Sequence, residues 1–320
     1  MVLGASGFIG RRIVAALAAT EWARPVAASR SATRAGFGAG IDSISLEATN
    51  QTELEQALQS AAAVVSCIAG ASDTIVRGGQ ALLAAVESVS PRPRLVYLSS
   101  MAAYGSARGV VGEAAPLLGD LGEYSLAKAT VDRLVANAPG VVRLRPGIVY
   151  GPGSPWWSVG IARLLLQHRL GDLGARGAGG CNLVHVDDVA LAVVRSLETR
   201  EAVGEAFNLG PAEPLTWNEY FRRYARALGA APLRRITGAR LGVELGLYGP
   251  ALKIAGKLLR RADQQLQYPP IRPWLTKLCQ HDIRLDVSKA EQRLGLQWRP
   301  LDASLEQTAA WLRSGGSDAS

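Results

Sequence analysis

Tyr124 and Lys128 stand four positions apart in the segment YSLAK. Residues at this spacing lie on one face of a helix, so the two side chains can approach each other. A nearby ammonium group favours phenolate and lowers the pKa of a Tyr from about 10. Tyr124 would then serve as a general acid or base. Only five of the 35 basic residues are Lys, which makes the choice of Lys here informative. About 0.1 such pairs are expected by chance, so the spacing alone does not decide the matter.

Ser99 and Ser100 follow the apolar segment RLVYL in the stretch LSSMAAYG. A hydroxyl at the end of a buried strand can hold a substrate oxygen or cap the following turn. Taken alone, the capping role explains these serines better. Together with Tyr124 and Lys128, a substrate-orienting role for Ser100 is favoured.

The segment GASGFIG at residues 4–10 has the glycine spacing of a dinucleotide-binding turn. Gly4 would allow the tight turn, Gly7 the approach of a pyrophosphate, and Gly10 the close packing of helix on strand. The N-terminus of the following helix would face the anion with unbonded N–H groups. A purely structural glycine turn is the less favoured alternative. The cofactor-binding residues predicted from this turn are Gly4, Ser6, Gly7, Phe8, Ile9 and Gly10.

Only Met1, Val2 and Leu3 precede this turn, although a first strand usually has five or six residues. We expect that the chain begins late relative to similar proteins. If Met1 is the natural start, the central strand is short, and the fold should lose stability.

The segment AASRSATR follows at the end of the second predicted strand. NAD-binding sites usually carry an acidic residue there, which bonds the 2′-hydroxyl of the adenosine ribose. This chain has Ser29, Arg30 and Arg34 and no acid. Because these residues would hold a 2′-phosphate and a carboxylate would repel it, NADP is favoured over NAD. The alternative is that Arg30 is an ordinary surface residue of an Arg-rich chain.

Strand-like and helix-like segments alternate along residues 1–151. This order predicts an α/β fold, with a doubly wound parallel sheet of Rossmann type that is covered by helices on both faces. Ligands of such sheets bind outside the carboxyl ends of the strands. The predicted strands are 25–29, 62–70, 94–100, 141–151 and 205–210, and the predicted helices are 8–19, 50–59, 75–88 and 123–137. Residues 183–198 are predicted to form a strand followed by a helix.

After residue 151 this alternation gives way to Gly-, Pro- and Trp-rich stretches and then to mostly helical patterns. We predict a dinucleotide-binding domain at 1–150, to which 183–210 returns, and a smaller substrate-binding lobe made of 151–182 and 211–320. Trp156, Trp157 and Trp274 would give the lobe apolar surface or simply fill its core. A basic amphipathic helix at 251–261 is better explained as an ordinary lobe helix than as a lid or a membrane contact.

Composition excludes several classes of protein. Apolar residues make up 48% of the 320 residues, but no run of 18 lacks a charge, and the N-terminus has no signal-peptide pattern. Three scattered Cys and three scattered His argue against a metal site and for a reducing, cytoplasmic location. The net charge of +8 is spread out, which disfavours nucleic acid as a partner. We expect a small-molecule substrate and no stable membrane insertion. The sequence leaves open whether the chain forms a homodimer.

The order of the motifs GASGFIG, SCIAG, SSMAAYG, YSLAK, RPGIVYGPG and NLVHVDDVA resembles the extended short-chain dehydrogenase/reductase family, also called the NAD-dependent epimerase/dehydratase family. The similarity covers most of the chain and weakens between about 230 and 280. It implies a bound nicotinamide cofactor and a Ser-Tyr-Lys site. Ser100 would orient the substrate oxygen, Tyr124 would exchange its proton, and Lys128 would bind the nicotinamide ribose and tune Tyr124. The resemblance also places Ala69, Pro146 and Ile148 along the cofactor.

Departures from the family pattern bear on the reaction. Sugar dehydratases of the family carry Thr-Asp-Glu at the serine position, where this chain has Ser99, Ser100 and Met101. Nucleotide-sugar epimerases often carry an Asn where this chain has Gly147. The resemblance therefore favours an NADPH-dependent carbonyl reductase, or its reverse, acting on a fairly apolar substrate. An epimerase with tightly bound NAD and a non-catalytic cofactor sensor are the alternatives.

Overall fold

The computed structural model describes residues 1–31, 36–38, 40–211, 213–244, 246 and 271–316. The chain forms two compact units. The first unit contains Met1–Gly147, Val186–Gly210 and Leu285–Trp298. The second unit contains Ile148–His185, Pro211–Arg284 and Arg299–Ser320.

The first unit is built on a seven-stranded sheet with the order β10-β7-β5-β4-β1-β2-β3. All neighbouring strands pair in parallel, and the first strand lies inside the sheet, as in a doubly wound Rossmann fold. The predicted fold class is therefore confirmed. The strands are β1 (Val2–Leu3), β2 (Val26–Ser29), β3 (Asp42–Ser45), β4 (Ala63–Ser66), β5 (Arg94–Leu98), β7 (Val141–Pro146) and β10 (Ala206–Leu209).

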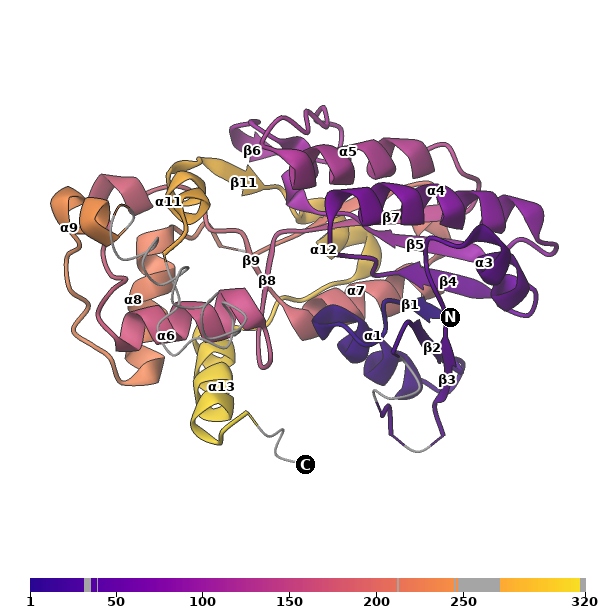
Figure 1. Ribbon diagram of the computed structural model, residues 1–320, viewed down its shortest axis with the longest axis horizontal. Coiled ribbons are helices and arrows are strands. Elements are labelled where there is room, and N and C mark those ends of the chain that lie inside the picture. The colour runs from indigo at the N-terminus through magenta and orange to yellow at the C-terminus, as the bar shows by residue number, and fades with distance from the viewer. Residues whose placement is uncertain (32–35, 39, 212, 245, 247–270, 317–320) are drawn as a thin grey trace. The chain divides into compact units, whose positions relative to one another are not determined.

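Helices cover both faces of this sheet (Figure 1). On one face, α3 (Gln51–Leu58), α4 (Ser72–Ser88) and α5 (Glu123–Val135) pack side by side. On the other face, α1 (Phe8–Ala18) packs against α7 (Val186–Glu198). Because neither face meets water, the inner strands can be continuously apolar.

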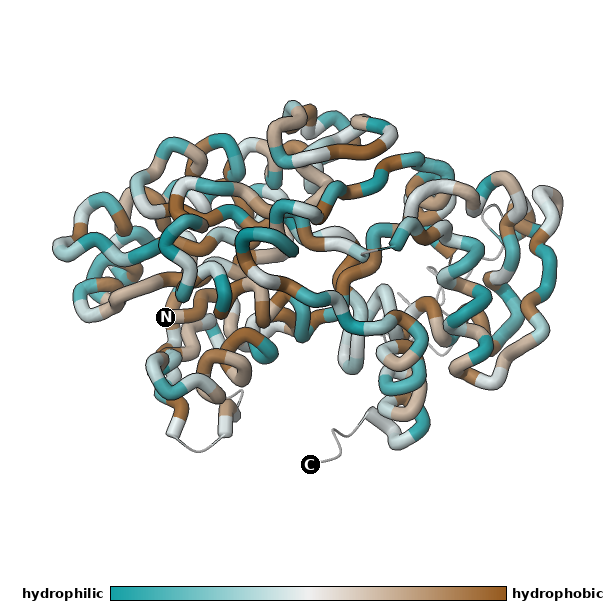
Figure 2. The backbone as a smooth tube through the Cα atoms, turned by 180° about the vertical axis from the view of Figure 1, so that it is seen from behind, coloured by the Kyte–Doolittle hydropathy of each residue, from teal (hydrophilic) through white to brown (hydrophobic). Residues whose placement is uncertain are grey.

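The core under α3, α4 and α5 is made of aliphatic side chains from the strands and the helices, with the Tyr97 ring among them. In Figure 2 the helices alternate between hydrophilic and hydrophobic residues along the tube, as expected where one side of each helix is buried. Asn50 caps α3 by accepting a hydrogen bond from the Glu53 amide. The Glu53 carboxylate accepts in turn from the Glu47 amide and the Asn50 side chain.

The remaining elements assigned to the first unit are short. They are η1 (Met101–Tyr104), β6 (Gly109–Val111), η4 (Arg200–Ala202) and α12 (Ser288–Leu294), and α12 packs on β10. β11 (Ile283–Leu285) begins in the second unit and ends in the first.

The second unit combines helices with a two-stranded parallel sheet of β8 (Ile148–Tyr150) and β9 (Leu183–His185). Its central helix, α8 (Trp217–Leu228), begins at a complete capping box formed by Thr216 and Glu219 and ends at the left-handed Gly229. One face of α8 is fully buried and largely aromatic. The other elements are the π-helical turn η2 (Pro155–Gly160), α6 (Ile161–Leu166), η3 (Gly174–Gly177), α9 (Gly238–Val243), α11 (Pro273–Gln280) and α13 (Leu301–Arg313).

The observed division of the chain differs from the predicted one at two places. β9 pairs with β8 in the second unit and does not join the central sheet, and residues 285–298 belong to the first unit. The single strand predicted at 141–151 is interrupted, because the Gly147 amide donates to Leu209 in the first unit while the Ile148 amide donates to Asn182 in the second. The helix predicted at 251–261 lies outside the described residues.

Candidate active site

The glycine turn, residues Gly4–Gly10, connects β1 to α1 with very little space. Gly4 has a φ of +75°, and its amide donates to the Ala28 carbonyl oxygen over 2.9 Å. A Cβ at Gly10 would lie 2.3 Å from the Gly4 oxygen, and one at Gly4 would lie 2.7 Å from the Cys67 oxygen. Only glycine fits either position.

The first turn of α1 suits an anion. No side chain caps this turn, and it contains no acidic residue. The backbone N–H groups at a helix start carry a partial positive charge and need acceptors. A pyrophosphate is an anion that such a turn holds well.

Three serine hydroxyls are buried at the carboxyl edge of the sheet. They belong to Ser29 at the end of β2, Ser66 at the end of β4 and Ser99 just after β5. None of the three makes a hydrogen bond within the described part of the chain. Because buried hydroxyls normally have partners, and because ligands of doubly wound sheets bind at this edge, the edge fits a polar ligand that lies across β1.

Ser100 and Tyr124 are brought together by η1 and α5. The hydroxyl of Ser125 donates to the Ala102 carbonyl oxygen over 2.6 Å, which ties the start of α5 to η1. The Ser100 side chain accepts from the Ala102 amide over 3.2 Å and lies close enough to the Tyr124 hydroxyl to lower its pKa. The Tyr124 residue keeps 47% of its surface exposed, although protein atoms crowd its hydroxyl and exclude much of the solvent there.

The predicted lowering of the Tyr124 pKa is not found in the structure. Burial raises the pKa of Tyr124, and the hydrogen bond to Ser100 only partly opposes this rise. Lys128 does not reverse it, since its ammonium donates to the Leu98 carbonyl oxygen over 3.0 Å. The protein by itself therefore holds Tyr124 as a neutral phenol, which is the form that donates a proton.

Lys128 is 4% exposed and sits above the ring of Tyr97, with its Nζ 5.5 Å from the ring centroid. Burial lowers the pKa of Lys128 to about 8, although the nearby Cys67 and Asp132 favour the charged form. The ammonium thus stays mostly charged at neutral pH and titrates just above it. A group that titrates near neutral pH in a ligand-binding edge is typical of a functional site.

Behind Lys128 lies a buried ion pair that the sequence analysis missed. Asp132, one turn further along α5, binds Arg145 of β7 through two hydrogen bonds of 2.8 and 2.9 Å. Arg145 also donates to the Tyr104 hydroxyl over 3.0 Å, and that hydroxyl donates to Asn208 over 2.6 Å. The network fixes α5, η1, β7 and β10 relative to one another, and thereby the backbone that carries Ser100, Tyr124 and Lys128.

The family assignment follows from a match that covers this whole framework. The family model described as "NAD dependent epimerase/dehydratase family" matches residues 1–210. The chain belongs to this family. The recognition made from the motifs is confirmed.

Two curated relatives of this chain are named as reductases. The 2′-dehydrokanamycin reductase of Streptomyces kanamyceticus is 30% identical over 242 residues, which is 72% of this chain and 66% of that protein. The 3-diazoavenalumate denitrifying reductase of a Streptomyces species is 32% identical over 165 residues, which is 49% of this chain and 53% of that protein. The matches thus span between about half and two thirds of these relatives.

Solved structures of the family share the fold at low identity. The UDP-glucose 4-epimerase of Thermotoga maritima has a TM-score of 0.73 at 19% identity, with 98% of both chains covered. The dTDP-glucose 4,6-dehydratase of Bacillus anthracis, solved with NAD, has a TM-score of 0.74 at 19% identity, with 98% of this chain and 96% of that chain covered. The chain thus belongs to a family of nicotinamide-dependent enzymes, the extended short-chain dehydrogenase/reductase class.

The family's nicotinamide cofactor fits the residues of the first unit. The glycine turn would hold its pyrophosphate, Ser29 would face its adenosine ribose, and Lys128 would reach its other ribose. Ala69 is exposed three residues beyond β4, the strand next to β1, and Pro146 is buried at the end of β7. Ile148, the remaining predicted contact, begins β8 in the second unit.

Arg11 was not predicted as a site residue, yet it lies beside the glycine turn. Its Nε donates to the Ser6 carbonyl oxygen and its Nη1 to the Gly36 carbonyl oxygen, both over 3.3 Å. Its guanidinium is 5.3 Å from the centroid of the Phe37 ring. Arg30 is exposed after β2, and Arg34 lies outside the described residues. Nothing in the sequence indicates that Arg11 reaches the loop after β2.

Thiol chemistry is disfavoured at this site. Burial raises the pKa of the Cys67 thiol to about 12, although Lys128 opposes the rise. Burial also raises the pKa values of Cys181 and Cys279 in the second unit. All three thiols are free and inert as nucleophiles.

The described residues contain no group of three or more His, Cys, Asp or Glu side chains that could hold a metal ion. They also contain no helix that is both long enough and apolar enough to cross a bilayer.

Proposed function

We propose that this protein is an NADPH-dependent reductase that converts a carbonyl group of a small, fairly apolar substrate into a secondary alcohol. The observation that carries the proposal is geometric: the Tyr124 hydroxyl lies beside Ser100, and the buried ammonium of Lys128 stands one helical turn further along α5. Reduction of a carbonyl requires a proton donor at the oxygen, and this arrangement provides one.

Each residue has a separate task. The nicotinamide cofactor, when bound, supplies the hydride for the carbonyl carbon. The Ser100 hydroxyl holds the carbonyl oxygen, and Tyr124 transfers its phenolic proton to that oxygen. Lys128 then stabilises the phenolate until solvent returns the proton. A positioned general acid typically accelerates a reaction by about 10²–10⁴-fold.

Reduction is favoured over water elimination because residues 99–101, where sugar dehydratases of the family carry Thr-Asp-Glu, contain no acid. Ser99 and Ser100 follow β5, and Met101 begins η1. The two curated relatives named above are reductases, which supports the same choice. We also propose a cytoplasmic location, where NADPH is the common reductant and free thiols persist.

The preference for NADPH rests on charge at the adenosine end. β2 ends at Ser29, whose buried hydroxyl makes no hydrogen bond in the described structure, and no acid follows it there. Arg30 and Arg11 supply positive charge close to this strand end and the glycine turn. Guanidinium groups bind phosphate more strongly than they bind hydroxyl groups.

The first test is a fluorescence titration of the purified full chain with NADPH and with NADH, followed by a panel of ketones and aldehydes. The proposal expects reversible, tighter binding of NADPH and its consumption with at least one carbonyl compound. Tightly retained NAD, with interconversion of nucleotide sugars and no net consumption of cofactor, would overturn the proposal in favour of an epimerase.

A further inference from the structure

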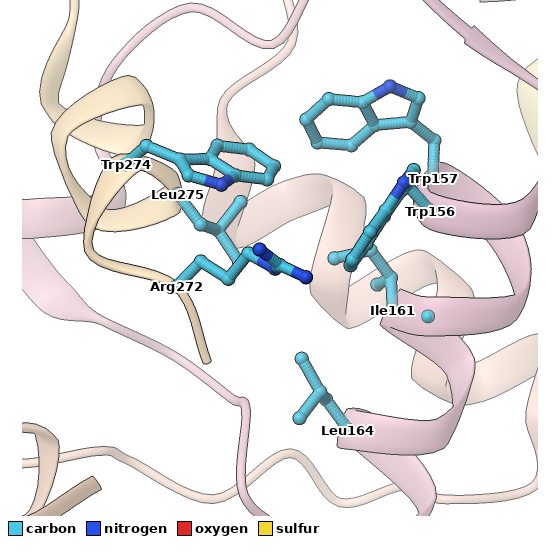
Figure 3. Close-up of a pocket in the computed structure, with 8 residues that line it drawn as sticks. Trp156, Trp157, Ile161, Leu164, Arg272, Trp274 and Leu275 are labelled. Carbon is cyan, nitrogen blue, oxygen red and sulfur yellow. The ribbon is translucent and has the colours of Figure 1, made fainter. Parts of the chain in front are cut away.

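The second unit holds a small hollow lined by three tryptophan side chains (Figure 3). We call it the tryptophan recess. Its floor and sides are otherwise aliphatic, apart from one guanidinium group. The residues that line it are Trp156, Trp157, Gly160, Ile161, Leu164, Arg272, Trp274 and Leu275.

The three indoles meet edge to face and do not stack. Trp274 lies 6.5 Å from Trp156 and 5.7 Å from Trp157 between ring centroids, at interplanar angles of 77° and 74°. The Arg272 guanidinium lies 4.6 Å from the centroid of Trp156. Trp274 is the most exposed of the three at 44%, so its ring offers surface for a further flat group.

Contacts with α8 hold two of the three tryptophans of the recess in place. Trp156 and Trp157 belong to the π-helical turn η2. Such turns are rare in proteins, and those that occur are often found at functional sites. The Tyr220 hydroxyl of α8 donates to the Trp157 carbonyl oxygen, and the Tyr224 hydroxyl donates to that of Ser158 over 3.3 Å. Trp157 also packs on Trp217 at 5.8 Å. α8 thus preorganises the turn.

Trp274 distinguishes the recess from ordinary core. It is 44% exposed, and Trp156 and Trp157 are also partly exposed. A group of exposed indoles would be unfavourable in water, and such patches commonly mark binding sites.

We propose that the tryptophan recess binds an aromatic carboxylate. The indole faces would stack on its flat ring, and the Arg272 fork would bind its carboxylate. The cavity of about 20 Å³ is little larger than one water requires, so the ring lies over the indoles at the mouth and only a small substituent enters.

A cationic ligand is disfavoured, although aromatic cages often bind cations. Arg272 already occupies the face of Trp156 and would repel a second positive charge. This proposal goes beyond the proposed reaction, because it concerns a binding site within the second unit and can be tested without cofactor or turnover.

The test is isothermal titration calorimetry of the full chain without cofactor. The probes are trans-cinnamate, the neutral cinnamyl alcohol, the non-aromatic cyclohexanecarboxylate and the cationic benzyltrimethylammonium. Saturable binding of cinnamate, with each of the other three at least about tenfold weaker, is expected. No saturable binding of cinnamate, or binding of the cation with equal affinity, would overturn the proposal.

Two substitutions locate the site. Trp274→Leu keeps apolar volume but removes the flat ring, and Arg272→Gln removes the charge. Each should weaken cinnamate binding about tenfold, because stacking and charge-assisted hydrogen bonds have this magnitude. Trp22→Phe and Arg284→Gln, at exposed positions outside the recess, should leave binding unchanged. Unchanged binding in both recess variants, with melting temperatures like that of the parent, contradicts the assignment.

Discussion

The candidate active site in the first unit and the tryptophan recess in the second unit are opposite kinds of surface. The active site places buried, titratable groups, such as Lys128, near buried serine hydroxyls that have no partner in the described part of the chain. The recess places large apolar rings, such as Trp274, where water can reach them. A site for chemistry must hold and move charge, whereas a site for recognition needs mainly shape and apolar area. The two units therefore call for different experiments.

The largest expected effect tests Tyr124. Tyr124→Phe removes the proton donor and keeps the ring, so kcat for carbonyl reduction should fall by about 10²–10⁴-fold. NADPH affinity should stay within about twofold, because the substitution removes only a hydroxyl group. Steady-state kinetics and fluorescence titration measure the two quantities. Leu126→Ala, at an exposed position on the same helix, is the matched control and should retain turnover. Full activity of Tyr124→Phe would remove the basis of the proposed function.

The second expected effect concerns the buried network behind the active site. Asp132→Asn leaves the Arg145 charge buried without its carboxylate, and such losses cost about 3–5 kcal/mol of the free energy of unfolding. Urea unfolding measures the change. Asp73→Asn breaks the exposed pair with Arg77 and should cost less than about 0.5 kcal/mol. Equal losses in the free energy of unfolding for the two variants would show that the buried ion pair stabilises the protein no more than the exposed one.

The third expected effect is a pH dependence of stability caused by Lys128. Its pKa is about 8 in the folded protein, against about 10.5 when unfolded, so the unfolded chain binds more protons between these values. The cost of burying the ammonium is therefore full below pH 8 and disappears as the pH rises toward 10.5. Relative to Lys128→Met, the parent should gain up to about 3 kcal/mol over this range. Unfolding curves at pH 7 and pH 10 give this difference, and a flat difference would contradict the buried, shifted Lys128.

The smallest expected effect concerns cofactor choice. Arg11→Gln and Arg30→Gln should each weaken NADPH binding by about tenfold and leave NADH binding unchanged, since only NADPH carries the 2′-phosphate. Fluorescence titration with both cofactors measures the ratio. Arg24→Gln, at another exposed position in the first unit, serves as the control. Equal weakening of both cofactors by either site variant would assign that residue a structural role.

Local signals made the framework of the first unit predictable. The glycine turn, the strand-then-helix alternation and the YSLAK spacing each occupy a few consecutive residues, and β1, α1 and α5 begin where these patterns indicate. β3 was missed because Asp42–Ser45 is an edge strand with half-exposed side chains, so its residues are polar and carry little strand signal.

Features that depend on distant parts of the chain were not predictable. The contact of Asp132 with Arg145 depends on how α5 packs against β7. The Tyr124 pKa was predicted in the wrong direction, because spacing gives the distance to a charge but not the loss of solvent around the hydroxyl. Trp156 and Trp274 were predicted to supply apolar surface, but a meeting of indoles from such distant segments has no local signature.

The two buried thiols of the second unit provide an internal probe for the opening of that unit. Cys181 and Cys279 are buried there, whereas Cys67 of the first unit is partly exposed. Because burial raises their pKa values, a thiol reagent reacts with Cys181 and Cys279 only when the surrounding structure opens. Peptide mapping after pulsed alkylation would therefore time the opening of the second unit, in the unmodified protein and without an introduced label.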